Sequence, residues 1–265
     1  MIPISDDNPT RIKPYVVYAL IAINVLVYII DHVGATNAFG RLWNWSMVPY
    51  SVISDVRVVP VLNQVGQIVG FSKAPEVGPH PQWITIFSSM FLHGGLAHIG
   101  GNMLFLWIFG NNIEDTLGHF KFILFYLACG VLAAITHIVV SFMGGSQFIP
   151  TVGASGAIAG VLGAYLILFP QARVRTLVLF WIIWHFVEIP AVFVLGVWFL
   201  TQLTGILGTG GQVGGGVAYG AHIGGFIAGV ILILLVGGRR LINRRPRRYY
   251  RAYDDDQPYP WRKRD

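Results

Sequence analysis

The feature that most constrains this chain is a succession of apolar segments, each close to the length that crosses a lipid bilayer. About twenty residues of helix span the hydrocarbon core of a membrane. Hydrophobic residues make up 54% of the 265 residues and charged residues only 11%, whereas roughly a quarter of a soluble domain is charged. The sequence therefore predicts an all-α membrane protein with six transmembrane helices. The six segments run from about Tyr15 to Ile30, Trp83 to Phe109, Phe120 to Phe142, Ser155 to Phe169, Leu177 to Leu203 and Gly215 to Val236.

A long connection, from Asp31 to Pro81, separates the first two predicted spans. It is rich in Trp, Gly, Pro and Val and is too mixed in polarity to cross the bilayer. Because structureless loops of this length are uncommon, we expect it to fold against the outer face of the membrane domain.

The net charge of +6 is a property of the C-terminal end. Ten Lys/Arg and four Asp lie between Arg239 and Asp265, and the charges of the remaining chain cancel. The cluster abuts a span, which favours binding to anionic lipid over binding to nucleic acid. We expect a cytoplasmic N-terminal segment (1–13), one six-span domain (14–237) and a basic cytoplasmic tail (238–265) that ends in disorder.

The distribution of Lys and Arg among the short loops predicts the orientation. The loops before the fourth and sixth spans contain neither residue, while both terminal segments contain Lys or Arg next to a span. The positive-inside rule then places both termini in the cytoplasm. The predicted location is the cell membrane, with Ser155 at the outer end of its helix.

A glycine-flanked serine opens the fourth span, in the stretch Thr151-Val152-Gly153-Ala154-Ser155-Gly156-Ala157. The first N–H groups of a helix lack partners within it and favour a negative charge. Ser155 therefore lies where a nucleophile could work beside an oxyanion site. The alternative is that Gly153 and Gly156 only permit close helix packing, as in the Gly156–Gly160 spacing.

The second span carries the densest polar set, His93 to Asn102. His98 and Asn102 are four residues apart and share a helix face. His93 is turned by about 140° from His98 on a continuous helix, so we expect it to support the outer loop. The alternative is a hydrogen-bond network that only holds helices together.

The sixth span places His222 among small residues at positions 220, 221, 224 and 225. Such a surface lets two helices approach closely, and it predicts contact with the fourth span, which Gly224→Leu would wedge open. A buried imidazole is a suitable general base for a serine. Glu114 and Asp115 fall at the inner end of the second span, so we predict a Ser155–His222 dyad without a carboxylate.

Three further polar groups lie within the predicted spans: His137, His185 and Glu188. His185 and Glu188 would be one turn apart on the fifth span, and we interpret them as structural hydrogen-bonding groups, with a role in gating as the alternative. The histidine spacings lack a metal-site pattern, so no metal is predicted. Cys129 is interpreted as a small core residue.

These residues, in this order and on separate spans, resemble the rhomboid family of intramembrane serine proteases. The resemblance covers about Lys13 to Val236. It implies Ser155 as nucleophile, His222 as general base, and an oxyanion site formed by His98, Asn102 and the Ser155 backbone N–H. It implies a supporting role for His93 and no cofactor. The implied substrates are single-pass membrane proteins, cut in or near the transmembrane segment at a small residue after sideways access between the second and fifth spans.

The sequence departs from the family pattern at two places. Ala159 stands where many relatives have an aromatic residue that stacks on the catalytic histidine, so another group must hold His222; we name Tyr219 or Tyr165. The outer loop has Arg41-Leu42-Trp43 and Trp45 in place of the Trp-Arg pair of many relatives.

Two other classes of function compete with the protease. A catalytically silent rhomboid-like protein would bind transmembrane helices without cutting them, but such relatives have lost the serine or the histidine. A channel or transporter would need a polar path across the bilayer, whereas the polar residues here gather toward the outer side.

Overall fold

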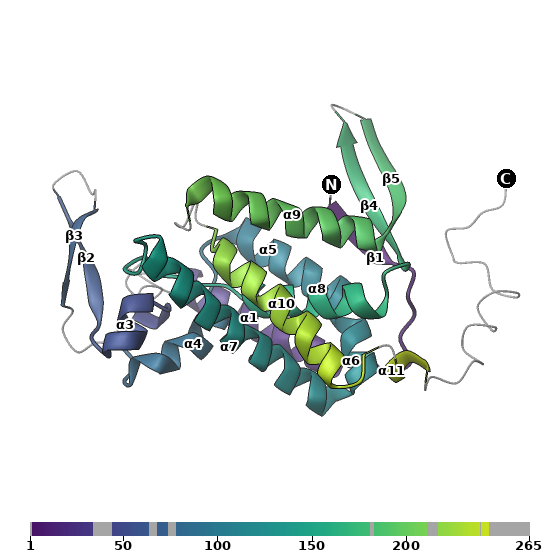
Figure 1. The fold of residues 1–265 in the computed structure, drawn as a ribbon, viewed down its shortest axis with the longest axis horizontal. Helices are drawn as coiled ribbons and strands as arrows, with labels where there is room; N and C mark the ends of the chain where they lie inside the picture. Colours follow the sequence, from purple (N-terminus) through teal and green to yellow (C-terminus); the bar gives the residue numbers. More distant parts are fainter. Residues whose placement is uncertain are drawn as a thin grey trace, which may run out of the picture.

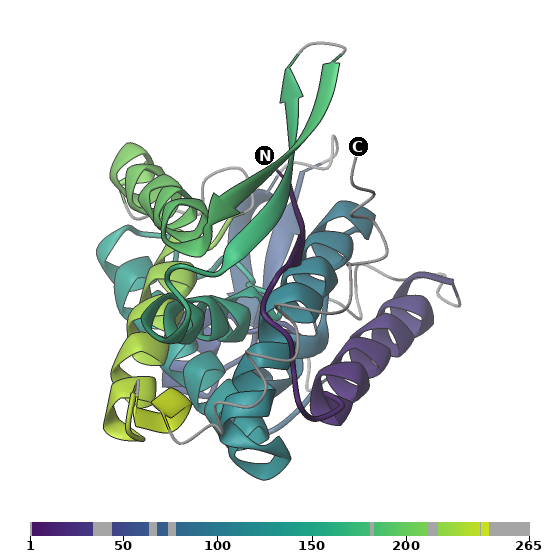
Figure 2. The same ribbon diagram turned by 90° about the vertical axis from the view of Figure 1, so that its right-hand side faces the viewer.

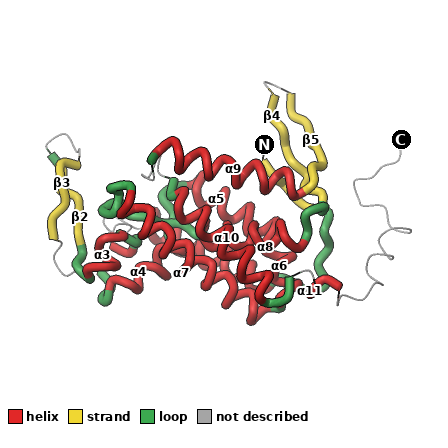
Figure 3. The backbone as a smooth tube through the Cα atoms, in the orientation of Figure 1, coloured by secondary structure: helices red, strands yellow, loops and turns green. Residues whose placement is uncertain are grey.

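The structure is a computed structural model that describes residues 2–33, 44–63, 68–73, 78–180, 183–210, 217–238 and 240–243. Helices make up most of it (Figure 3). The helices are α1 (Tyr15–Val33), α3 (Pro49–Ser54), α4 (Thr85–Ser88), α5 (Leu96–Phe105), α6 (Asn111–Leu117), α7 (His119–Met143), α8 (Ser155–Leu168), α9 (Ala191–Thr209), α10 (Tyr219–Leu235) and α11 (Arg240–Asn243). Short 3-10 turns cover Gln82–Ile84 and Ser89–Phe91, and a π-helical segment (Leu106–Gly110) joins α5 to α6.

The bundle is organised around α8, which lies inside it (Figure 1). Every residue from Gly156 to Tyr165 is buried. The helix packs most extensively against α10 and α7. A Cβ on Gly225 of α10 would overlap the carbonyl oxygen of Gly156, so the two backbones are in direct contact. The small residues of α8 and α10 thus permit the close approach that fixes the ends of both helices relative to each other.

Four of the predicted spans agree with helices of the structure to within a few residues: α1, α7, α8 and α10. By length and composition, α1, α7 and α9 can cross a membrane, while α8 and α10 are shorter apolar helices. Many large apolar side chains of α1, α7 and α9 face outward, as lipid-facing surfaces require.

The predicted second span was wrong at its start. Residues 82–91 form short turns, and the continuous helical run begins only at Leu96 and continues through the π-helical segment to Leu117. Gly94 and Gly95 interrupt the helix, since Gly95 adopts an extended backbone just before α5. His93 therefore precedes the helix, and the expected 140° separation from His98 does not apply.

The predicted fifth span was also wrong at its start, and with it the purely helical fold class. Residues 173–190 form a hairpin of β4 (Arg173–Phe180) and β5 (Ile183–Pro190), and α9 begins only at Ala191. The hairpin extends beyond the helices (Figure 2), and β1 (Ile2–Asp6) pairs antiparallel with β4. β-branched and aromatic residues are common in this stretch, which suits strands as well as an apolar span.

This hairpin changes the environment of His185 and Glu188. Both residues lie on β5 rather than on a helix. A separation of three residues on a strand places them on opposite faces, so the expected hydrogen bond between them is absent. Glu188 instead accepts a hydrogen bond from Arg173 Nη1 at 3.2 Å.

In the described parts of the connection between the first two spans, α3 packs against α7 at one end of the bundle, and the hairpin of β2 (Val58–Leu62) and β3 (Ile68–Lys73) projects from that end (Figure 1). Met47 and Thr151 exchange backbone hydrogen bonds of 3.1 and 2.8 Å. Ser88 Oγ donates to the carbonyl of Trp45. The loop is thereby tied to the segment that precedes α8; Arg41, Leu42 and Trp43 lie outside the described residues, as does the tail from residue 244.

The opposite end of the bundle holds the carboxylates of α6. Glu114 accepts the N–H groups of Val16 and Val17 at 2.9 and 2.8 Å, which satisfies two first-turn donors of α1. Asp115 accepts from the backbone N–H groups of Arg11 and Ile12. Both carboxylates thus fix the start of α1.

Candidate active site

The site begins with the first residue of α8. Ala154 precedes the helix and accepts the N–H of Ile158. The N–H groups of Ser155, Gly156 and Ala157 therefore have no partner within the helix. Gly153 adopts a φ of +125°, a backbone conformation that favours glycine. This turn places Ser155 Oγ and its own N–H at the same helix end.

Ser155 and His222 form the predicted dyad. His222 Nε2 lies 2.8 Å from Ser155 Oγ. The two residues are 67 positions apart in sequence and come from α8 and α10, whose glycine contacts hold the backbones together. Both side chains are partly accessible. The pair has the geometry in which an imidazole can remove the proton of a serine hydroxyl.

His98 and Asn102 lie on α5 beside the dyad. A Cβ placed on Gly153 would be 2.7 Å from His98 Nε2 and 3.6 Å from Ser155 Oγ, so the His98 ring lies against the turn that carries the serine. Asn102 is buried, with 8% of its surface exposed. Its amide donates one hydrogen bond to His93 Nε2 at 2.9 Å and has a second N–H for another acceptor.

His93 belongs to this cluster, contrary to the expectation that it supports the outer loop. Besides its bond to Asn102, its ring packs edge-on against His98 with centroids 5.0 Å apart. The reason is the break in the helix at Gly94 and Gly95, which turns the residue before α5 back onto the α5 face. The structure thus brings together Ser155, His222, His98, Asn102, His93, Gly153 and Gly156.

His222 is held by two residues that the sequence reasoning missed, both on α9. Gln202 Oε1 lies 2.8 Å from His222 Nδ1, and the Trp198 ring lies 5.8 Å from the imidazole, centroid to centroid. The suggestion of Tyr165 was wrong, because its hydroxyl bonds to Asp6. Tyr219 contacts the backbone of α9 at Gly205. Gln202 is a polar group within an apolar segment, a signal of function in membranes that was available in the sequence.

The glycines around His222 divide between two neighbours. Gly225 and Gly229 contact the backbone of α8, but a Cβ on Gly224 would meet the side chain of Thr136 on α7. The expectation that Gly224→Leu would separate the fourth and sixth spans was therefore wrong, because Gly224 faces α7 and not α8. Successive helical residues point about 100° apart, so Gly224 and Gly225 face different helices.

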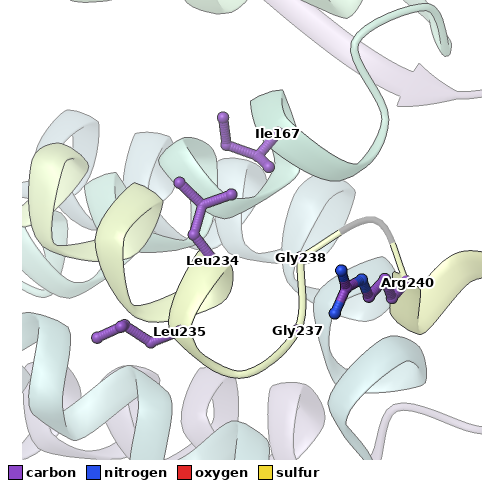
Figure 4. Close-up of a pocket in the computed structure, with 6 residues that line it drawn as sticks. All are labelled: Ile167, Leu234, Leu235, Gly237, Gly238 and Arg240. Carbon is purple, nitrogen blue, oxygen red and sulfur yellow. The ribbon is translucent and has the colours of Figure 1, made fainter.

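Other polar groups and cavities lie away from the dyad or serve structure. His137 Nε2 is 2.7 Å from Thr151 Oγ1, which ties α7 to the segment before α8. Across the residues the structure describes, no group of three His, Cys, Asp or Glu side chains could hold a metal ion. The pocket between Ile167, Leu234 and Arg240 (Figure 4) lies near the far end of α8, about 18 Å along the helix from Ser155.

Comparison with known proteins places these features in a family. The Rhomboid domain model matches residues 80–239, more than half of the chain. The chain is 30% identical over 151 residues to Rhomboid protein 1, mitochondrial, of Saccharomyces cerevisiae, covering 56% of this chain and 40% of the relative. It is 40% identical over 85 residues to Rhomboid protease GluP of Bacillus subtilis, covering 32% and 16%.

A third relative is Presenilin-associated rhomboid-like protein, mitochondrial, of Homo sapiens, which is 36% identical over 91 residues, covering 34% of this chain and 24% of the relative. The matched part thus spans 40% or less of the length of these three curated relatives. The matched domain contains Ser155, His222, His98 and Asn102, and the bundle that carries them is apolar enough for a membrane. The chain is an integral membrane protein of the rhomboid family.

Proposed function

We propose that the chain is an intramembrane serine endopeptidase with Ser155 as nucleophile and His222 as general base. The observation that carries this proposal is the 2.8 Å separation between Ser155 Oγ and His222 Nε2. A packing role alone would not require a hydroxyl and an imidazole to meet at the N-terminus of a helix. The protease named among the relatives supports the same activity class.

In the proposed reaction, His222 takes the Ser155 proton while Oγ attacks the scissile carbonyl carbon. Negative charge develops on the carbonyl oxygen, and the Ser155 N–H, His98 and the second N–H of Asn102 donate to it. The His222 proton then passes to the leaving amine, and the acyl-enzyme is hydrolysed by a water that His222 activates in the same way. Donors fixed in advance of the reaction are the largest contribution in this type of catalysis.

The proposed substrates are single-pass membrane proteins, cut in or near the transmembrane segment at a small residue. Access would be sideways, between the helices α5 and α9, and water would reach the dyad from the outer side. The proposal includes six spans, with both termini in the cytoplasm, in the cell membrane. The basic tail would bind anionic lipid at the inner surface.

The alternative is a catalytically silent rhomboid-like protein that binds transmembrane helices. The two proposals differ in whether Ser155 is activated. The test is labelling of the reconstituted protein by a fluorophosphonate or isocoumarin probe, with Ser155→Ala and His222→Ala as controls. Labelling of wild type alone supports the protease, and a fluorescent transmembrane reporter should be cut by wild type only. If folded wild type is neither labelled nor able to cut the reporter, the binder replaces the protease.

A further inference from the structure

The group that orients His222 comes from α9. The Gln202 side chain lies between α9 and the imidazole of His222, with 8% of the residue's surface exposed. Its Oε1 contacts His222 Nδ1 at 2.8 Å. Its Nε2 contacts the carbonyl oxygen of Trp198 at 3.2 Å and Thr201 Oγ1 at 3.0 Å. All the polar atoms of this amide are therefore engaged.

These contacts determine which amide atom faces the histidine. A carbonyl oxygen only accepts hydrogen bonds, so the amide atom that faces the Trp198 carbonyl must be the nitrogen. Thr201 Oγ1 donates its own hydrogen to the same carbonyl at 2.6 Å, which leaves its lone pairs to accept from Gln202. Oε1 is consequently the atom directed at His222.

The orientation of the amide then determines the tautomer of the imidazole. Because Oε1 can only accept, Nδ1 of His222 must carry the proton that bonds to it. In the neutral ring Nε2 is then unprotonated and accepts the hydrogen of Ser155 Oγ. A chain of hydrogen bonds from the Trp198 carbonyl to Ser155 thus leaves His222 Nε2 ready to take the proton of the Ser155 hydroxyl.

We propose that Gln202 is the positioning residue of the catalytic base, and that it acts only while α9 is packed against α10. Gln202 takes the place of the carboxylate of a catalytic triad, without its charge. This inference rests on the proposed protease function and adds a condition to it: moving α9 outward removes the acceptor of Nδ1.

The packing of α9 makes such a condition physically reasonable. Only 17% of the membrane-spanning length of α9 is buried in the protein, against 44% of that of α7. Phe193, Val197 and Leu200 expose more than half of their surface. At Gly205, one turn beyond Gln202, α9 contacts the Tyr219 ring of α10 so closely that a Cβ would overlap it. The contact between α9 and the dyad thus depends on a narrow strip of small and aromatic residues.

Few titratable side chains lie near the His222 imidazole. The titratable side chains that act on it are His98 of α5 and His137 of α7, while Ser155 of α8 and Gln202 of α9 supply its hydrogen bonds. Replacing Gln202 by a carboxylic acid therefore introduces an anion at a place where the described neighbours are neutral or basic.

The experiment compares two near-isosteric variants of the full-length protein in liposomes. Gln202→Met keeps the volume and removes the acceptor, whereas Gln202→Glu keeps an acceptor oxygen. The rate of fluorophosphonate labelling is measured from pH 5 to 9, with folding checked by size exclusion and melting temperature. We expect Gln202→Met to slow labelling roughly 10- to 100-fold, because Nδ1 is left without a partner. Gln202→Glu should recover most of the rate at high pH, with its half-maximal pH raised by about one unit or more, since a carboxylate stabilises the protonated ring.

A second pair of variants tests the dependence on α9 without changing Gln202. Gly205→Leu should wedge α9 away from Tyr219 and slow labelling as Gln202→Met does. Gly208→Leu is the matched control, since a Cβ at Gly208 meets nothing within 4 Å, and it should label at the wild-type rate.

The outcomes separate this inference from the protease function itself. If wild type is not labelled, the proposed function fails and the role of Gln202 falls with it. If wild type is labelled and folded Gln202→Met matches it at every pH, Gln202 is not a positioning residue. Equal losses in Gln202→Met and Gln202→Glu would also overturn that role, and a folded Gly205→Leu at the wild-type rate would refute the dependence on α9.

Discussion

The ring of His98 lies against the backbone of Gly153, where a Cβ would be only 2.7 Å from His98 Nε2. Gly153 also has a φ of +125°. The residue therefore serves two purposes: it permits the turn into α8, and it leaves space for a proposed oxyanion donor beside Ser155.

Gly153→Ala should lower the rate of serine labelling at least tenfold, because the methyl group displaces His98 and strains the turn. The matched control is Gly145→Ala, which also changes a glycine of positive φ (+73°) but has open space at its Cβ. Labelling rates normalised to folded protein compare the two. Similar rates in both variants would show that His98 does not need the space at Gly153.

Asn102→Ala should lower the cleavage rate of a transmembrane reporter by roughly 10²-fold, the typical cost of removing one oxyanion donor. His93→Ala should have a smaller effect of the same kind, because His93 acts by holding the Asn102 amide at 2.9 Å. The double variant should then be no slower than Asn102→Ala alone. Fully multiplicative losses would mean that His93 works independently of Asn102.

Gly225→Ala should destabilise the bundle by about 1–3 kcal/mol, since its methyl group would overlap the Gly156 carbonyl and force α8 and α10 apart. Gly101→Ala is the control: it lies in α5, where a Cβ meets nothing within 4 Å, and alanine is the better helix former. Thermal unfolding in detergent, followed by tryptophan fluorescence, should show a lower melting temperature for Gly225→Ala only. Equal melting temperatures would contradict direct backbone contact at Gly225.

The stability of the bundle should depend on pH through Asp6, which lies on β1 outside the spanning helices. Burial raises the pKa of the Asp6 carboxyl from 3.8 to about 7, and the carboxyl binds Tyr165 and Asn112. The folded state therefore favours the protonated form, and its advantage is lost as the pH rises from about 4 through 7. Wild type should lose stability over this range by at most about 1.4 kcal/mol per pH unit from this group.

Asp6→Asn should remove that dependence and be the more stable protein at pH 8. The measurement is the difference in melting temperature between wild type and variant at pH 5 and pH 8. Glu188→Gln is the control, because the Glu188 carboxylate lies on β5 in an exposed ion pair with Arg173. A difference between wild type and Asp6→Asn that does not change with pH would refute the titration of Asp6.

Much of the site could be predicted because its parts have local signatures. The glycines around Ser155 indicate the start of a helix. The four-residue spacing of His98 and Asn102 places both on one face of their helix, whatever the position of that helix in the bundle. The early start of the second and fifth spans could not be corrected from hydropathy, because apolar residues lead into each span (83–92 before α5, with few polar interruptions, and 177–184 before α9). Hydropathy measures transfer of side chains from water and does not report whether the backbone is a helix, a strand or a turn.

The sequence by itself determined the membrane class, the order of the polar groups along the chain and the choice of Ser155 and His222 as the candidate dyad. These depend on composition and on periodicities within single helices, which neighbouring residues specify. The tertiary structure decided which residues hold the dyad: Gln202 and Trp198 on the imidazole, His93 on Asn102, and Thr136 rather than α8 opposite Gly224. Those choices depend on the rotation and depth of each helix relative to its neighbours, and only the packing of all the helices together sets them.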